Sequence, residues 1–298
     1  MKSILLTGAT GFIGRHTILP LLEKGYTVHG VYTNQIIPEM TQVIWHKVDL
    51  HDQQAVKNLL EEIKPFYLLH LAWYVKPNEF WISPKNIDWL TSSLYLFEEF
   101  IKAGGKRAVL AGTISEYDES YGHCRENVTP CAPLTLYGRV KYALNLLTDS
   151  IAKQNNISLA WARLFPMFGC YEYPERLIPS LMNTLLKKNL FNVMNGQFIR
   201  DFMYVKETGD ALVALLDSEV TGSVNIASGN PVKIQDIVAY VGNKLNKNEL
   251  IHYHDGLNNY SQVTADVTRL FREVKWQPKY SLNSALDETI AWWSDRSV

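Results

Sequence analysis

The sequence is poor in the features that mark several classes of protein. Its 298 residues contain three cysteines, Cys124, Cys131 and Cys170, an odd number at irregular spacing. Such a set forms no disulfide framework and no short-range cluster of metal ligands, so we expect a reducing, cytoplasmic compartment and no metal site. The formal net charge is −1, and no apolar run reaches the roughly 18 residues of a membrane helix. These features argue against a nucleic-acid or membrane partner.

Short apolar runs alternate with longer helical patterns over the first half of the chain. We predict strands at 3–7, 26–32, 43–46, 66–72, 108–111 and 158–164, and helices at 12–24, 52–63, 87–103 and 135–153. Almost wholly apolar strands separated by helices are typical of a parallel sheet covered on both faces. With right-handed crossovers, this pattern predicts a doubly wound α/β fold of the Rossmann type.

The composition changes after Phe165. Prolines and aromatic residues become frequent, and helical patterns at 177–188 and 234–245 are separated by irregular segments. A chain of this length is expected to form about two lobes. We therefore assign residues 1–165 to a dinucleotide-binding Rossmann domain and residues 166–298 mainly to a smaller α/β substrate lobe. The chain is expected to return to the first domain near residues 200–230, with a strand at 222–226.

Three glycines stand directly after the first predicted strand, in Thr7-Gly8-Ala9-Thr10-Gly11-Phe12-Ile13-Gly14. Glycines here permit a tight turn, close approach of the backbone to a pyrophosphate, and close packing of helix on strand. The helix that follows offers free N–H groups and the positive end of its dipole to phosphates. The position of these glycines predicts a dinucleotide site; a tight turn without a ligand is the alternative.

A tyrosine and a lysine four residues apart, Tyr137 and Lys141, lie on the helix predicted at 135–153 and so share one helix face. A neighbouring ammonium favours phenolate, so Lys141 is expected to lower the pKa of Tyr137 and make it an acid/base near neutral pH. A solvated lysine beside a half-buried tyrosine is the alternative. A helper hydroxyl is expected at the end of the fifth strand, in residues 111–117, where α/β folds place their ligand crevice.

The stretch TGATGFIG, residues 7–14, resembles the opening of extended short-chain dehydrogenases/reductases, the NAD-dependent epimerase/dehydratase group. The resemblance covers the whole chain. It implies a catalytic set of Thr113, Tyr137 and Lys141, with Ser115 as a second candidate for the hydroxyl. Residues expected to contact the cofactor are Gly8, Thr10, Gly11, Phe12, Ile13, Gly14, Arg15, Thr33, Asn34, Asp49, Leu50, Leu71, Ala72, Trp73, Tyr137, Lys141 and Phe165. Residues expected to contact the substrate are Thr113, Ser115, Glu116, Tyr137, Pro166, Arg176 and Arg200.

Two departures from the family pattern bear on the reaction. Family dehydratases carry Asp-Glu after the helper threonine because eliminating water needs an acid and a base; Ile114 and Ser115 stand there instead. A galactose-type 4-epimerase would usually carry asparagine where Pro166 stands. The segments HLAW (70–73), AGTISEY (111–117) and RLFPMFG (163–169) are most similar to reductases of nucleotide-linked 4-keto-6-deoxy sugars.

The cofactor preference depends on the end of the second strand, Tyr32-Thr33-Asn34. A carboxylate there would hold the ribose hydroxyls of NAD and repel a 2′-phosphate. Its absence favours NADP, with NAD possible. Arg15 adds positive charge after the third glycine, unless it is an ordinary exposed arginine of the first helical turn.

We therefore expect reduction of the 4-keto group of a nucleotide-diphosphate-linked 4-keto-6-deoxy sugar. Tyr137 would protonate the developing alkoxide, Thr113 would bond the same oxygen, and Lys141 would hold the nicotinamide ribose. The resemblance implies that Arg200 grips the diphosphate; a surface ion pair with Asp201 is the alternative. Two other functions stay open: a nucleotide-sugar 4-epimerase with tightly bound NAD, and a non-catalytic NADP-sensing regulatory protein. The family also implies a homodimer.

Overall fold

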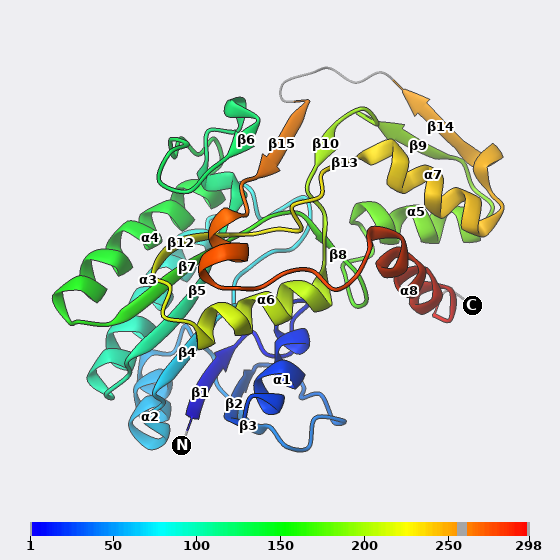
Figure 1. The fold of residues 1–298 in the computed structure, drawn as a ribbon. Coiled ribbons are helices and arrows are strands. Elements are labelled where there is room, and N and C mark those ends of the chain that lie inside the picture. The colour runs from blue at the N-terminus through cyan, green and yellow to red at the C-terminus, as the bar shows by residue number, and fades with distance from the viewer. Residues whose placement is uncertain (1, 255–260, 297–298) are drawn as a thin grey trace.

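The computed structural model describes residues 2–254 and 261–296. The outer ends of the two predicted domains, residue 1 and residues 297–298, lie outside the described residues. Seven parallel strands form the main sheet: β1 (Lys2–Thr7), β2 (Tyr26–Tyr32), β3 (Ile44–Lys47), β4 (Tyr67–His70), β5 (Arg107–Thr113), β7 (Ser158–Leu164) and β12 (Gly222–Ile226). Their order is β12-β7-β5-β4-β1-β2-β3 (Figure 1). This arrangement confirms the doubly wound Rossmann fold.

Helices cover both faces of this sheet. One face carries α1 (Gly14–Glu23) and α6 (Val205–Asp217), and the other carries α2 (Gln53–Ile63), α3 (Lys85–Lys102) and α4 (Leu136–Gln154) (Figure 1). Ile18 and Leu212 pack into the hydrophobic cluster under the first face, and Phe97 and Leu144 into the cluster under the second. The inner strands β4, β5 and β7 are buried along most of their length and are largely apolar, which is the pattern seen in the sequence, whereas the edge strand β3 is partly exposed.

The start of α4 is fixed by a side-chain cap. The hydroxyl of Thr135 accepts a hydrogen bond of 3.1 Å from the backbone N–H of Gly138, satisfying one of the orphan donors of the first turn. The same turn passes very close to the chain after β5: a Cβ on Gly138 would lie 2.3 Å from the carbonyl oxygen of Ser115. The cap and this close approach together place the first turn of α4 against the end of β5.

The remaining helices pack together beside the sheet. The helices α5 (Leu177–Leu186), α7 (Ile234–Leu245) and α8 (Leu282–Ser294) enclose a separate core that includes Leu181, Val238 and Leu286 (Figure 1). A parallel strand pair borders it, β9 (Phe191–Met194) with β14 (Ile251–His254). A second short pair, β8 (Met167–Phe168) with β11 (Met203–Tyr204), links this region to the end of β7.

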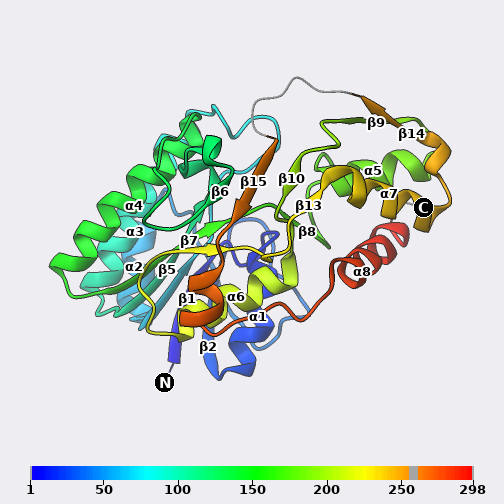
Figure 2. The ribbon, with the colours of Figure 1, turned by 45° about the horizontal axis from the view of Figure 1, so that its top comes forward.

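A small sheet joins segments that are distant in the sequence. Its order is β13 (Val232–Lys233), β10 (Ile199–Arg200), β15 (Gln262–Ala265) and β6 (His123–Cys124) (Figure 2). Short helical turns are η1 (Ile114–Glu116), η2 (Glu119–Tyr121) and η3 (Asn248–Leu250), with a π-helical turn, η4, at Arg269–Glu273. Within residues 2–254 and 261–296, none of the helices combines the length and the apolar character needed to cross a membrane.

Candidate active site

The carboxyl ends of β1 and β4 and the helix α3 are tied together by buried polar groups. Nδ1 of His70 lies 2.7 Å from the hydroxyl of Thr7, and its Nε2 lies 2.8 Å from the hydroxyl of Ser93. The Thr7 hydroxyl also accepts the backbone N–H groups of Leu71 and Ala72, at 3.2 and 3.3 Å. Burial lowers the pKa of His70 to about 3, so this imidazole is neutral and serves as a structural link.

The glycine loop after β1 fits a dinucleotide phosphate. A Cβ on Gly14 would lie 2.0 Å from the carbonyl oxygen of Gly8, so only glycine permits this close packing. The helix α1 begins there, and its N-cap residue, Ile13, supplies no side-chain cap to the first-turn amides. Nε of Arg15 is buried and has no hydrogen-bond partner among the described residues. The positive end of the α1 dipole and this buried N–H of Arg15 suit an anionic ligand.

Tyr137 and Thr113 meet as predicted from the sequence. The two side chains are hydrogen-bonded, and the backbone N–H of Tyr137 donates to the carbonyl of Trp81 at 3.1 Å. Burial raises the pKa of Tyr137 to about 12, while the bond from Thr113 and the charge of Arg176 act in the opposite direction. The expectation of a lowered pKa is wrong for this structure, because desolvation of the phenol outweighs the nearby positive charge.

Lys141 lies one turn further along α4 with its ammonium turned inward. Its Nζ donates to the carbonyl of Ala111 at 2.8 Å and lies 3.6 Å from the ring centroid of Trp73. Burial lowers the pKa of Lys141 to about 7, and the charge of Glu116 opposes that change. The solvated lysine considered as an alternative is therefore excluded, since the side chain is only 3 % exposed.

Glu116 does not face a substrate, contrary to the sequence prediction. Its side chain is fully buried, and the carboxylate accepts from the backbone N–H of Thr113 at 2.8 Å, from Nε1 of Trp161 at 2.8 Å and from Nε of Arg163 at 2.9 Å. Burial acts to lower the pKa of Arg163, but the neighbouring carboxylate outweighs it and the pKa is raised. Glu116 therefore fixes the backbone at Thr113. Ser115 is also buried, and its N–H donates to the hydroxyl of Thr113.

The side chain of Arg15 packs between the ring of Tyr171 and the glycine loop. Its guanidinium lies 3.6 Å from the ring centroid of Tyr171 and donates to the carbonyl of Thr10 at 3.2 Å. Burial lowers its pKa, and the charges of Tyr171 and Glu39 act against this. Arg15 is thus held by an aromatic face and is not a freely exposed first-turn arginine. Thr33 and Asn34 are exposed directly after β2.

The other predicted cofactor residues divide into exposed and buried groups. Asp49 is exposed and accepts the backbone N–H of His51 at 2.9 Å. Leu50 and Phe165 are 4 % and 2 % exposed and belong to two hydrophobic clusters. Their side chains contribute to the core. Pro166, half-buried, follows Phe165 at the end of β7.

Arg200 lies on β10, in the small sheet. Its Nη1 donates to the carbonyl of Ile199 at 2.9 Å, burial lowers its pKa, and the charge of Glu119 opposes that change. The carboxylate of Asp201 instead accepts from the hydroxyl and N–H of Ser228, at 2.6 and 2.9 Å. The hydrogen bonds of Asp201 thus run to the segment that follows β12, which does not favour the surface ion pair considered from sequence.

Two groups near Tyr137 were missed as site residues from sequence. The ring centroids of Phe80 and Trp81 lie 4.9 and 5.8 Å from that of Tyr137, both edge-on, and the guanidinium of Arg176 lies 5.3 Å from the ring of Phe80. The density of aromatic residues between 73 and 81 is the sequence signal that marks this wall. Arg176, predicted from sequence as a substrate contact, lies close enough to Tyr137 for its charge to act on the phenol.

Glu172 is a buried acid close to Arg176. Its Oε2 has no hydrogen-bond partner among the described residues, and burial raises its pKa to about 8, against the charge of Arg176 and the N–H of Gly169. The pKa of Glu172 is higher in the folded protein than its ordinary value of 4.5. The neutral acid therefore makes its full contribution to the free energy of unfolding below about pH 4.5. That contribution is lost as the pH rises through about 8.

We expect Glu172→Gln to remove this pH dependence. Between about pH 5 and 8 the free energy of unfolding of the wild type should fall relative to that of the variant, by up to ~1.4 kcal/mol per pH unit. Urea unfolding at several pH values measures the difference. A difference that stays constant across that range would show that Glu172 is ionised in the folded protein.

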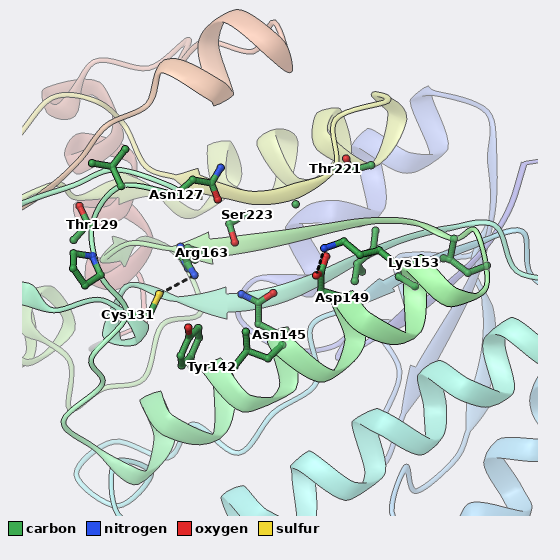
Figure 3. A pocket seen from close by; sticks show the side chains of 17 residues that line it. Asn127, Thr129, Cys131, Tyr142, Asn145, Asp149, Lys153, Arg163, Thr221 and Ser223 are labelled. Carbon is green, nitrogen blue, oxygen red and sulfur yellow. Dashed lines mark hydrogen bonds and ion pairs between the residues drawn. The ribbon is translucent and has the colours of Figure 1, made fainter.

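A cavity of about 630 Å³ lies on another side of α4 (Figure 3). Tyr142, Asn145 and Asp149 line it from α4, and Arg163 points to Cys131, whose Sγ accepts from Nη2 at 3.1 Å. Thr113, Tyr137 and Lys141 are not among its lining residues. This cavity is therefore separate from the cluster of Thr113, Tyr137 and Lys141.

Among the described residues, neither the cysteines nor the possible metal ligands form a second site. Cys124, Cys131 and Cys170 are free thiols, and Cys124 and Cys170 are buried. Over the part of the chain that the structure describes, no three or more His, Cys, Asp or Glu side chains gather in a group able to hold a metal ion.

A parallel sheet with a glycine loop at the end of its first strand is the architecture of dinucleotide-binding proteins. The model of the NAD dependent epimerase/dehydratase family matches residues 4–227, and the chain belongs to this family. The resemblance to extended short-chain dehydrogenases/reductases is thereby confirmed.

Relatives of this chain are named for different reactions on nucleotide-linked sugars. A UDP-glucuronate 4-epimerase of Thermodesulfobacterium geofontis is 24% identical over 98% of this chain and 96% of its own. A dTDP-4-dehydro-6-deoxyglucose reductase of Escherichia coli is also 24% identical, over 97% of this chain and 96% of its own. The solved UDP-glucose 4-epimerase of Thermus thermophilus, a complex with NAD, has a TM-score of 0.84 at 20% identity, covering 98% of this chain and 99% of its own. Its likeness supports the fold alone.

Proposed function

We propose that this protein is an NAD(P)H-dependent reductase of the 4-keto group of a nucleotide-diphosphate-linked 4-keto-6-deoxy sugar. The observation that carries the proposal is the buried, hydrogen-bonded pair of Thr113 and Tyr137. The phenol of Tyr137 keeps its proton at neutral pH, which is the protonation state that a proton donor in a reduction needs. The nearby Glu116 is engaged by Thr113, Trp161 and Arg163, so it supplies no second acid/base of the kind that elimination of water needs.

The residues of the site have distinct roles in this reaction. The bound nicotinamide cofactor supplies the hydride. Tyr137 donates its proton to the oxygen of the substrate carbonyl as negative charge develops there, and Thr113 hydrogen-bonds the same oxygen. Lys141 holds the cofactor ribose through its ammonium group. Phe80 and Trp81 form an apolar wall beside the tyrosine, which suits a sugar that lacks a hydroxyl at C6.

The glycine loop and Arg15 are proposed to bind the cofactor phosphates. Arg15 has a buried Nε with no partner among the described residues, and its guanidinium is held on Tyr171. That arrangement supports NADP, whose 2′-phosphate would add negative charge close to the loop. Residues 1–165 would bind the cofactor, and residues 166–298 would mainly bind the sugar nucleotide, with Arg176 and Arg200 as its cationic contacts. We also propose that the enzyme works as a homodimer.

The loss of absorbance of reduced nicotinamide tests this function. NADPH and NADH are offered separately, each with a panel of 4-keto-6-deoxy sugars linked to dTDP, GDP, CDP or UDP. We expect stoichiometric loss with one sugar nucleotide and faster loss with NADPH. No loss with any member of the panel would contradict the reductase assignment.

A nucleotide-sugar 4-epimerase is the second candidate, favoured by the 24% identity to the UDP-glucuronate 4-epimerase over nearly the whole chain. Such an enzyme needs the same Thr113, Tyr137 and Lys141 but returns the hydride to the opposite face of the sugar. It would purify with tightly bound NAD and consume no cofactor. Absorbance and mass spectrometry of the denatured protein would reveal that NAD.

A further inference from the structure

The indole of Trp73 covers the ammonium group of Lys141. Nζ of Lys141 lies 3.6 Å from the ring centroid of Trp73, inside the ~6 Å reach of a cation–π interaction, for which tryptophan is the strongest partner. The same Nζ donates to the carbonyl of Ala111 at 2.8 Å. The ammonium is thus removed from water and held between a carbonyl oxygen and an aromatic face.

The orientation of this indole is itself fixed. Nε1 of Trp73 donates to Oδ1 of Asn86 at 2.9 Å. Asn86 is fully buried, and its Nδ2 donates to the carbonyls of Phe80 and Ser83, at 2.7 and 2.9 Å. Trp89 adds a ring contact, with the two centroids 5.9 Å apart. Because Asn86 connects the indole to the loop that precedes α3, the fold itself fixes the orientation of Trp73 beside Lys141.

The charged and titratable groups that face Lys141 do little to offset the effect of burial, which disfavours the charged form of the amine. His70, at the end of β4, is neutral because burial lowers its pKa to about 3. Tyr137, on the same helix, keeps its proton because burial raises its pKa to about 12. Glu116, on η1, favours the charged lysine, but its carboxylate is engaged by Arg163. With the pKa of Lys141 lowered to about 7, the indole face and the Ala111 carbonyl are the remaining groups that favour its charge.

We propose that Trp73 is a positioning residue, which keeps the Lys141 ammonium charged and fixes its direction at the cofactor site through the cation–π contact. The inference rests on the proposed function in one respect, that Lys141 serves the bound cofactor. It assigns Trp73 a role through Lys141, beyond the cofactor contact that the family resemblance implies.

The titration of Lys141 tests this role in the full-length protein without cofactor or sugar. Lysine labelled with ¹³C at Cε is followed by NMR from pH 5 to 11, and the Lys141 signal is assigned by its absence in Lys141→Met. Trp73→Leu should lower the Lys141 midpoint by about one pH unit, since a desolvated cation–π contact is lost. Trp73→Phe keeps an aromatic face and should lower it by less than half as much.

Fluorinated tryptophan separates the loss of the cation–π attraction from any change in packing that leucine causes. The fluorinated ring keeps nearly the same shape, but its attraction for cations is weaker. Incorporation throughout the wild type should lower the Lys141 midpoint, whereas incorporation into Trp73→Phe should leave that variant's midpoint unchanged. A midpoint insensitive to fluorination, or one lowered equally in Trp73→Phe, would overturn the proposal. Because the titration needs no turnover, its failure is distinguishable from failure of the reductase assay.

Discussion

Replacing Tyr137 with phenylalanine should lower the turnover number by a factor of about 10²–10⁴, the usual contribution of a general acid. The change removes only the phenol oxygen, and the ring keeps its edge-on contacts with Phe80 and Trp81. The Thr113 hydroxyl would remain at the substrate carbonyl, but no proton would be delivered to the alkoxide. Turnover is measured by loss of NADPH absorbance with the sugar nucleotide that the wild type reduces.

Binding of NADPH separates a catalytic role from a structural one. Its dissociation constant, measured by quenching of tryptophan fluorescence, should stay within about twofold of wild type in Tyr137→Phe, because the phenol oxygen makes no contact that the phosphates need. Tyr142→Phe is the matched control on the same helix, since Tyr142 lines the separate cavity. Equal losses of turnover in the two variants, or a parallel loss of NADPH binding in Tyr137→Phe, would remove Tyr137 from the proposed role.

Replacing Glu116 with glutamine should lower the free energy of unfolding by about 3–5 kcal/mol, the range found when one partner of a buried ion pair is removed. The carboxylate accepts from Thr113, Trp161 and Arg163, all of which are donors. Glutamine offers one oxygen and brings two N–H donors of its own, so Arg163 would remain buried beside an amide. Turnover should fall as well, because the end of β5 that presents Thr113 loses its anchor.

Urea unfolding at pH 7 measures that loss of stability, with Glu61→Gln as the control. Glu61 is exposed on α2, and its Oε1 lies 3.9 Å from Nζ of Lys57. Glu61→Gln is therefore the same substitution made at a position in contact with water. Its variant should stay within about 0.5 kcal/mol of wild type. Similar stabilities for Glu116→Gln and Glu61→Gln would show that the buried pair with Arg163 does not support the fold.

The sheet and the position of the site were predictable because both depend on local signals. The largely apolar run at 158–164 matches β7, since a strand buried on both faces needs nearly continuous apolar sequence. The strand expected at 222–226 matches β12. The glycine loop and the Tyr137–Lys141 spacing pointed to the candidate site because close packing and a shared helix face constrain residue type directly. The helix at 136–154 begins where Thr135 caps it, a signal visible in the sequence.

Features that depend on burial were not predictable in the same way. The sequence places Glu116 three residues after Thr113 but does not show that Trp161 and Arg163, forty-five or more residues away, turn its carboxylate inward. The pKa of Tyr137 was misjudged because pairwise charge is visible in a motif, whereas desolvation depends on the surrounding fold. Helix α6, Val205–Asp217, was missed although it covers one face of the sheet together with α1, because it lies where the sequence pattern becomes irregular.

Transfer of deuterium is the most direct test of the central claim, that hydride passes from the cofactor to C4 of a nucleotide-linked 4-keto sugar. NADPH carrying deuterium at its transferable position is incubated with the protein and the sugar nucleotide selected by the absorbance assay, and the product is analysed by mass spectrometry and NMR. The reductase account predicts one deuterium, at C4, for each NADPH consumed. A product that carries no deuterium at C4, although NADPH has been consumed, would contradict it.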